Sequence, residues 1–157
     1  MKDFFKENYI PILVLILSSL LLVFGAQVLT NEFFKTASYE NLETIDDRIR
    51  CAEYLGWQVD KSSETVKSVY IPNTETVEFN EYNVMQKMCG FDLSHYMGKG
   101  AECYTYRILN FPSENSVNAF LNLIIYDGKM IGGDCEVLEY DDLYLPVKLS
   151  KTNTDIS

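Results

Sequence analysis

The chain has 157 residues, of which 47% are hydrophobic and 23% are charged, and this composition fits one globular domain rather than a disordered chain. Its formal net charge is −10. Two lysines and two acids cancel within residues 1–29, so the whole excess lies after that segment. A domain this acidic repels nucleic acid and anionic lipid, and we expect no nucleic-acid partner.

The N-terminal segment is apolar. Residues 9–29 carry no charge, and as a helix they would be about 31 Å long, close to the thickness of a bilayer's hydrocarbon core. This exceeds the usual apolar part of a signal peptide, so we predict one uncleaved transmembrane helix, with cleavage as the alternative. Lys2 and Lys6 favour a cytoplasmic N-terminus over residues 1–8. We therefore expect a single-pass cell-membrane protein with an extracytoplasmic domain.

The remainder divides into a juxtamembrane linker over residues 30–41, a domain over residues 42–149 and a polar tail over residues 150–157. The domain begins with a helix predicted over residues 43–55, because apolar residues recur there at intervals of three and four. Gly56 suits the left-handed residue that follows a helix. The first part of the domain is therefore helical.

Two extended segments and a second helix follow. We predict a short strand or edge segment over residues 57–59 and a strand over residues 65–71. The second helix is predicted over residues 76–89 and ends at Gly90, after which Asp92 can cap a short turn.

Everything after this turn predicts sheet. Asp127 and Gly128 stand between two apolar runs and are a strong signal for a hairpin, while Gly132 and Gly133 suggest a bulge or a close backbone approach. The strands are predicted over residues 101–109 and 117–125, from residue 129 onward, and over residues 143–149. The fold class is therefore α+β. We expect two helices packed on one face of an antiparallel sheet of about four to five strands, preceded by one transmembrane helix.

Few residues suggest a reactive site. His95 is the only histidine, and although Asp92 and Ser94 are its neighbours, adjacency in sequence does not build a catalytic triad. A surface position in a turn is the simpler interpretation of His95. The chain has no P-loop and no dinucleotide-binding motif, and we expect neither a cofactor nor a metal.

The four cysteines lie at positions 51, 89, 103 and 135, and none are spaced as C-x-x-C. Outside the cytoplasm they would be free to form disulfides. Cys103 and Cys135 would be able to meet across neighbouring strands, as one of three complete pairings. Buried core thiols are the alternative interpretation.

Asp134 is the carboxylate we single out, because it follows the two glycines, and a solvated turn is its alternative interpretation. Tyr104 and Tyr106 lie on one predicted strand face. Tyrosine-rich sheet surfaces favour contact with protein or carbohydrate, although ordinary packing explains most single tyrosines. These three residues, with Asp92 and His95, are the candidate functional residues.

Several short motifs occur in a fixed linear order between residues 45 and 149. They are Tyr54-Leu55-Gly56-Trp57-Gln58-Val59, Ile71-Pro72, Tyr82-Asn83-Val84-Met85-Gln86, the run from Gly90 to Lys99, Tyr104-Thr105-Tyr106, Asn110 and Ile131-Gly132-Gly133-Asp134. In this the chain resembles a family of uncharacterised membrane-anchored domains from Clostridia-type, Gram-positive bacteria. The resemblance implies a bacterial cell-envelope protein and no activity. Read structurally, Asn83 and Gln86 are expected to hydrogen-bond a buried backbone edge.

The sequence thus favours a non-enzymatic extracytoplasmic binding module whose partner is a protein or an envelope polymer near the membrane. Two alternatives stay open. One is a small cell-envelope hydrolase that uses Asp134 or another carboxylate, which needs a pocket holding two carboxylates. The other is a sensor domain that acts with a membrane partner.

Overall fold

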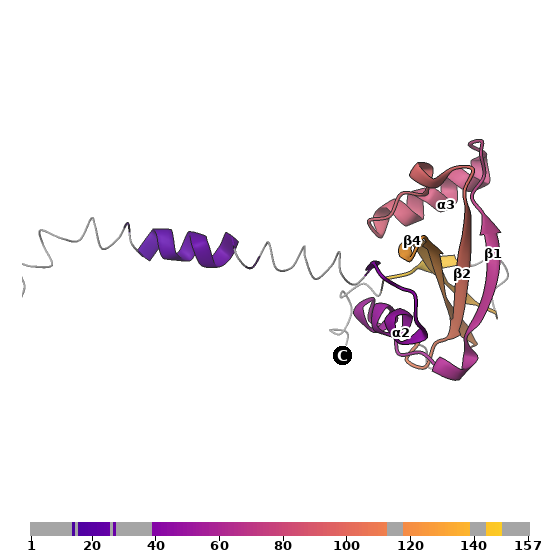
Figure 1. The fold of residues 1–157 in the computed structure, drawn as a ribbon, viewed down its shortest axis with the longest axis horizontal. Helices are drawn as coiled ribbons and strands as arrows, with labels where there is room; N and C mark the ends of the chain where they lie inside the picture. Colours follow the sequence, from indigo (N-terminus) through magenta and orange to yellow (C-terminus); the bar gives the residue numbers. More distant parts are fainter. Residues whose placement is uncertain are drawn as a thin grey trace, which may run out of the picture. The chain divides into compact units, whose positions relative to one another are not determined.

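The computed structural model describes residues 14, 16–25, 27, 39–112, 118–138 and 144–148. The chain divides into two units, Met1–Ala37 and Ser38–Ser157. All the strands belong to the second unit (Figure 1). Most of the predicted linker and the whole polar tail lie outside the described residues.

The prediction of a transmembrane helix is wrong. Within residues 9–29 the described residues, which are 14, 16–25 and 27, are helical. None of the helices in the described part of the chain is both long enough and apolar enough to cross a membrane. The prediction rested on the apolar composition of residues 9–29 alone.

The second unit contains a five-stranded antiparallel sheet with strand order β1-β2-β3-β4-β5, which confirms the predicted antiparallel run. Residues 57–59 do not form a strand; only an isolated bridge joins Val59 to Ile108. Residues 113–117 and 139–143, which the predictions partly covered, lie outside the described residues. The strands are β1 (Thr65–Tyr70), β2 (Gly100–Arg107), β3 (Ala119–Tyr126), β4 (Lys129–Val137) and β5 (Tyr144–Pro146).

Both predicted helices are present and end before the glycines predicted to follow them, while each begins one or two residues later than predicted, after a threonine cap. In α2 (Ile45–Tyr54), the Thr44 side chain accepts from the Asp47 N–H while the Asp47 carboxylate accepts from the Thr44 N–H, a complete capping box. Thr76 caps α3 (Val77–Met88). Gly56 and Gly90 follow these helices with φ of 99° and 86°, the left-handed conformation that glycine adopts without strain. The short 3₁₀ helices are η1 (Lys61–Ser63) and η2 (Leu93–Tyr96), the latter capped by Asp92 as predicted.

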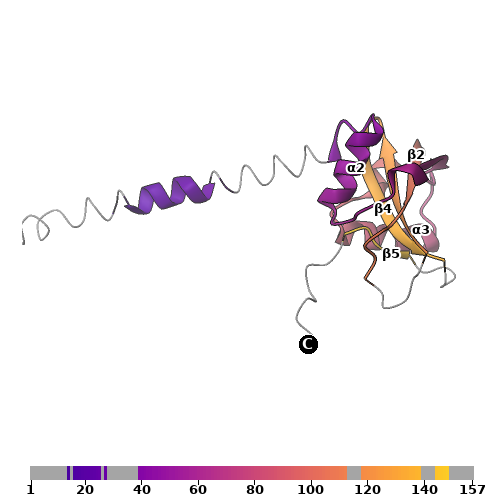
Figure 2. The ribbon, with the colours of Figure 1, turned by 90° about the horizontal axis from the view of Figure 1, so that it is seen from below.

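The two helices cover opposite faces of the sheet, which corrects the prediction that both pack on one face. Cys51 of α2 contacts Met130, and this face, the α2 face, also carries Tyr106 and Leu121. Phe79 of α3 packs with Cys103 on the other face, the α3 face. In both views β4 lies between α2 and α3 (Figure 1 and Figure 2). The reason is that β3 is buried along nearly its whole length, on both faces, and each face needs a cover.

A side chain hydrogen-bonds the backbone of β4 at Gly133, beyond the part of β4 that pairs with β5. Gln86 of α3 is fully buried; its Nε2 donates to the Gly133 carbonyl and its Oε1 accepts from the Gly133 N–H, both at 2.9 Å. A Cβ on Gly132 would lie 2.9 Å from Gln86 Oε1, and one on Gly133 would lie 2.4 Å from the Asn122 carbonyl oxygen. The glycine pair is therefore a close backbone approach, as predicted. Gln86 acts in place of a missing neighbouring strand.

Candidate functional site

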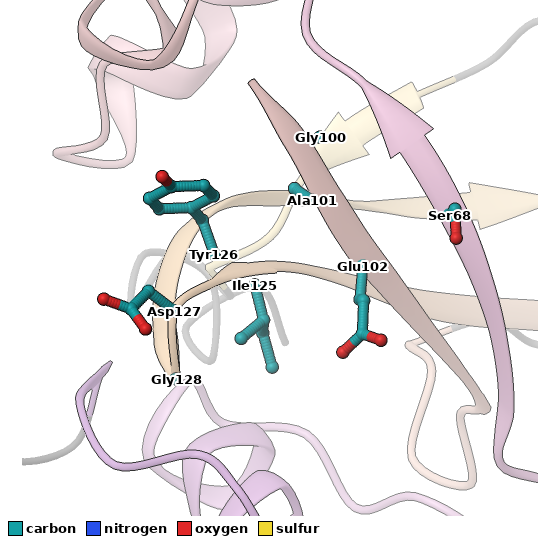
Figure 3. Close-up of a pocket in the computed structure, with 8 residues that line it drawn as sticks. All are labelled: Ser68, Gly100, Ala101, Glu102, Ile125, Tyr126, Asp127 and Gly128. Carbon is teal, nitrogen blue, oxygen red and sulfur yellow. The ribbon is translucent and has the colours of Figure 1, made fainter.

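A hollow of about 630 Å³ opens at one end of the sheet (Figure 3). Its floor is formed by β1, β2 and the end of β3, and its side by the turn between β3 and β4. The lining residues are Ser68, Gly100, Ala101, Glu102, Ile125, Tyr126, Asp127 and Gly128.

The floor of the hollow is a row of three paired residues. Ser68 pairs with Glu102, and Glu102 pairs with Ile125. Their side chains point to the same side of the sheet (Figure 3), which is the α2 face. Beside this row lies Gly100, where an added Cβ would meet nothing within 4 Å. Two of the residues that line the hollow, Ser68 and Gly100, are therefore small.

The charged groups of the hollow are carboxylates. Glu102 is exposed, and its Oε2 accepts a hydrogen bond of 2.7 Å from the Tyr104 hydroxyl. Asp127 begins the hairpin turn, with φ of 50°. None of the lining residues is basic. The hollow is therefore suited to a cationic or hydrogen-bond-donating group.

β1 borders the hollow and has an open outer edge. The Ile71 N–H donates to the Lys99 carbonyl, so the odd-numbered residues of this segment face β2. By the same alternation, the N–H and C=O groups of Val66, Ser68 and Tyr70 point away from the sheet. No residue in the described part of the chain bonds to these backbone groups. An unpaired edge of this kind is a template for another strand.

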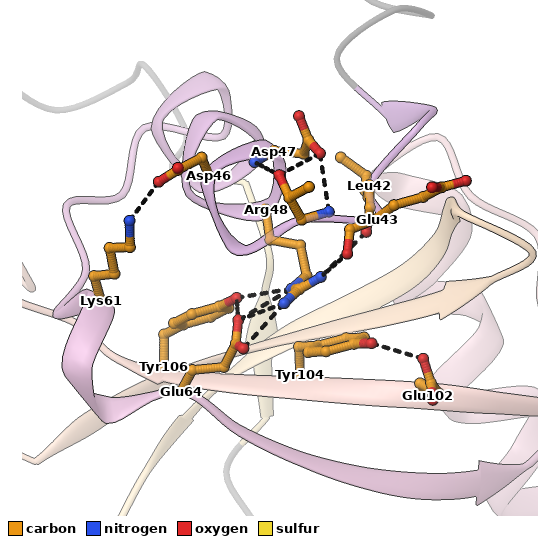
Figure 4. A network of polar contacts seen from close by, with 11 residues as sticks. Leu42, Glu43, Asp46, Asp47, Arg48, Lys61, Glu64, Glu102, Tyr104 and Tyr106 are labelled. Atoms are coloured by element: carbon orange, nitrogen blue, oxygen red, sulfur yellow. Dashed lines mark hydrogen bonds and ion pairs between the residues drawn. The ribbon is translucent and has the colours of Figure 1, made fainter.

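Tyr104 and Tyr106 belong to a structural network rather than to a free surface (Figure 4). Arg48 of α2 lies 4.0 Å from the Tyr104 ring centroid and donates to Tyr106 Oη at 3.0 Å. Its guanidinium also binds the Glu64 carboxylate and the carbonyls of Leu42 and Glu43. The fully buried Tyr106 hydroxyl donates to Glu64, and burial raises the pKa of Tyr106. Of the two tyrosines, only Tyr104 reaches the hollow, through Glu102.

Asp134 lies on the opposite face of the sheet, beneath α3. It is only 5% exposed and accepts hydrogen bonds from Tyr82 Oη at 2.6 Å and from Asn122 Nδ2 at 2.8 Å. Asn122 Oδ1 in turn accepts from the Thr105 hydroxyl. Burial raises the pKa of Asp134, although the bonds from Tyr82 and Asn122 oppose the shift. The carboxylate is satisfied and enclosed, so it is not an accessible acid or base.

Asp134→Asn is expected to stabilise the protein at pH 7 by on the order of 1 kcal/mol, because an amide keeps acceptor and donor atoms there without a buried charge. The folded-state pKa of Asp134 lies above its ordinary value of 3.8. The wild-type chain therefore loses stability as the pH rises from 3.8 through the raised folded-state pKa of Asp134. The variant has no carboxyl group at this position and does not show this loss. Urea unfolding at pH 4 and pH 7 measures this, with the exposed Glu53→Gln as control. A variant less stable than the wild type at pH 7 would contradict it.

Asp92 and His95 belong neither to the lining of the hollow nor to the hydrogen-bonded cluster around Asp134. The Asp92 carboxylate accepts from the backbone and hydroxyl of Ser94 and from Asn83 Nδ2, and the Ser94 hydroxyl is the largest cause that lowers its pKa. The His95 side chain is 78% exposed, with Nε2 3.9 Å from Asp92. The Leu93 N–H donates to Asn83 Oδ1. Asp92 is therefore a structural cap, and His95 lies in a surface turn.

Cys103 and Cys135 do not form the disulfide considered from the sequence. Cys103 lies on β2 and Cys135 on β4, with β3 between them, and their side chains are on opposite faces of the sheet. All four cysteines are free and buried, and burial raises the pKa of Cys51 to about 12. They are core thiols, which is the alternative interpretation. The described residues also contain no cluster of three or more metal-ligating side chains.

Sequence reasoning missed Ser68 and Glu102. The strands that hold Ser68 and Glu102 were both predicted, but neither residue was singled out. Neither strand pattern says that β1 ends the sheet, because edge position depends on the pairing of distant strands. The sequence did contain one signal: each of two strand-forming segments carries a small residue, Ser68 in one and Gly100 at the start of the other.

Comparisons with known proteins bring one finding. The sequence model of a family described as a domain of unknown function (DUF4830) matches residues 52–135. The match runs from the second half of α2 to β4 and includes both Gln86 and the floor of the hollow. No curated protein and no solved structure matches the chain. The expected likeness to a family without an assigned activity is confirmed, over a shorter range than predicted.

Proposed function

Because this chain belongs to the DUF4830 family, whose function is not assigned, we propose from its geometry that it is a binding module that adds an extended segment of another protein to the edge of β1. The observation that supports this is the open edge of β1 beside the hollow. Strand addition supplies affinity through backbone hydrogen bonds, and neighbouring pockets select side chains. This is the non-enzymatic binding role expected from the sequence, with a specific surface.

The side chains of β1 suit such a partner. Val66 and Tyr70 are 57% and 62% exposed, and with Ser68 they point to the α2 face. An added strand would pack apolar residues against Val66 and Tyr70. Elsewhere the chain closes an open strand edge with a buried side chain, as Gln86 does at Gly133. It leaves β1 without such a cover among the described residues.

The charge of the chain favours a different protein over a second copy of itself. Each copy carries a net charge of −10, so two copies repel. In an antiparallel β1–β1 pair, Ser68 would face Ser68, and Lys67 points to the α3 face, away from the hollow. A second copy would therefore place no basic group near Glu102. The hydrolase alternative loses Asp134, which lies outside the hollow, and would have to use Glu102 and Asp127 instead.

Ser68→Pro is expected to abolish strand addition while leaving the fold intact, because proline removes an N–H that points outward and is tolerated on edge strands. Linear peptides would be selected from a display library on the full-length chain. We expect selected peptides to bind the variant at least tenfold more weakly, with a change in stability below about 1 kcal/mol.

Val69→Pro is the matched control. Its N–H faces β2, so this substitution is expected to destabilise the sheet by about 3 kcal/mol. Peptides that bind wild type and Ser68→Pro equally, or an absence of selected peptides, would overturn the proposal. Self-association of the wild type that Ser68→Pro removes would show that a second copy is the occupant.

A further inference from the structure

The geometry points to a basic side chain, lysine or arginine, in the partner segment at the position beside Ser68, with its cation held by Glu102 in the hollow. This inference rests on the proposed function and names the sequence feature that the edge of β1 would select. It concerns the α2 face of the sheet, where the row Ser68–Glu102–Ile125 crosses three strands.

The position follows from strand spacing. Neighbouring strands lie about 4.8 Å apart, so a residue beside Ser68 in an added strand is about 10 Å, two spacings, from Glu102. Its side chain would leave the strand on the same face as Ser68 and Glu102. Ser68 has a small side chain and points to the same side of the sheet as Glu102 (Figure 3), and a Cβ added at Gly100 would meet nothing within 4 Å, which leaves room for a long side chain lying across β1.

The chemistry follows from the groups at the end of that path. Glu102 receives one hydrogen bond, from Tyr104, and the second oxygen of its carboxylate is free to accept others from a cation. Asp127 lines the same hollow and adds a second negative charge, with no basic residue among the lining residues. Lysine and arginine can lay their apolar stems over the strand and keep the charged end in the wet hollow.

The neighbouring positions give the motif its spacing. Side chains that share a face lie two residues apart along a strand. The partner residues two before and two after the basic one therefore lie beside Val66 and Tyr70, which are apolar and exposed. The expected motif is an apolar residue, any residue, lysine or arginine, any residue and a second apolar residue.

The test is the sequence preference of linear display peptides selected on the full-length chain and on Glu102→Lys, an exposed position where the fold tolerates a change. Peptides selected on the wild type are expected to carry the motif and to bind Glu102→Lys at least tenfold more weakly. Exchanging the central basic residue for glutamate is expected to restore binding to Glu102→Lys. Glu136→Lys, on β4, makes the same charge change outside the hollow and is expected to have little effect.

Each outcome separates this inference from the proposed function. Peptides that need the Ser68 N–H but show no basic preference would overturn the inference and leave strand addition standing. An equal loss of binding in Glu102→Lys and Glu136→Lys would show a general charge effect and would also overturn it. If no peptide is sensitive to Ser68→Pro, strand addition fails, and this inference fails with it.

Discussion

Arg48→Met is expected to lower the free energy of unfolding by about 3–5 kcal/mol, the range typical for removing one member of a buried ion pair. The Arg48 side chain is 6% exposed and that of Glu64 is 22% exposed, so the change leaves Glu64 without its cation in a poorly hydrated place. The carbonyls of Leu42 and Glu43 and the hydroxyl of Tyr106 lose donors as well. Urea unfolding at pH 7 measures the loss.

The same helix supplies the matched control. Arg50 pairs with Asp47, but its side chain is 70% exposed, and Arg50→Met is expected to cost less than about 1 kcal/mol. If the orphaned carboxylate causes most of the loss, Glu64→Gln added to Arg48→Met should recover part of it. A cost for Arg48→Met no larger than that for Arg50→Met would show that the network contributes nothing to stability.

This network shows what the sequence does not reveal. Arg48 was recognised only as part of a predicted helix, because its partners Glu64 and Tyr106 follow it by 16 and 58 residues. Local features were predictable: the glycines after both helices, and the hairpin at Asp127 and Gly128, whose φ values of 50° and 69° suit a two-residue turn. These depend on the conformational preferences of single residues. Contacts between side chains that are distant in the sequence depend instead on the order in which the strands pair.

The wrong prediction of helix packing has the same origin. Helices that precede strands were expected on one face, yet the buried residues on both faces of β3, such as Leu123 and Ile124, require two covers. The disulfide between Cys103 and Cys135, which was considered as one of three pairings, required neighbouring strands, but β3 separates the two residues. The apolar run at residues 9–29 has the composition of a membrane helix, whereas its described residues include no helix of spanning length. Composition and alternation identify elements, and pairing decides their surroundings.

Gln86 has a structural role that was predicted from the sequence and that a single substitution can test. The sequence predicted that it hydrogen-bonds a buried backbone edge, and its amide does so with both groups of Gly133. Gln86→Glu keeps the shape and one acceptor but replaces the donor Nε2 with a second oxygen. Ionised, that oxygen faces the Gly133 carbonyl oxygen, and we expect a loss of about 3 kcal/mol at pH 7.

The loss should depend on pH in a defined direction. A protonated carboxyl can donate to the Gly133 carbonyl as the amide does, so the introduced group should have a folded-state pKa above the ordinary glutamate value of about 4.3. Stability then falls as the pH rises from that ordinary value through the raised folded-state pKa. Gln86→Glu should therefore unfold at nearly the wild-type urea concentration at pH 4 and well below it at pH 7. The exposed Gln58→Glu serves as control and should show little change at either pH. A cost that is equal at both pH values would mean that lost packing, rather than the unmatched oxygen facing Gly133, causes it.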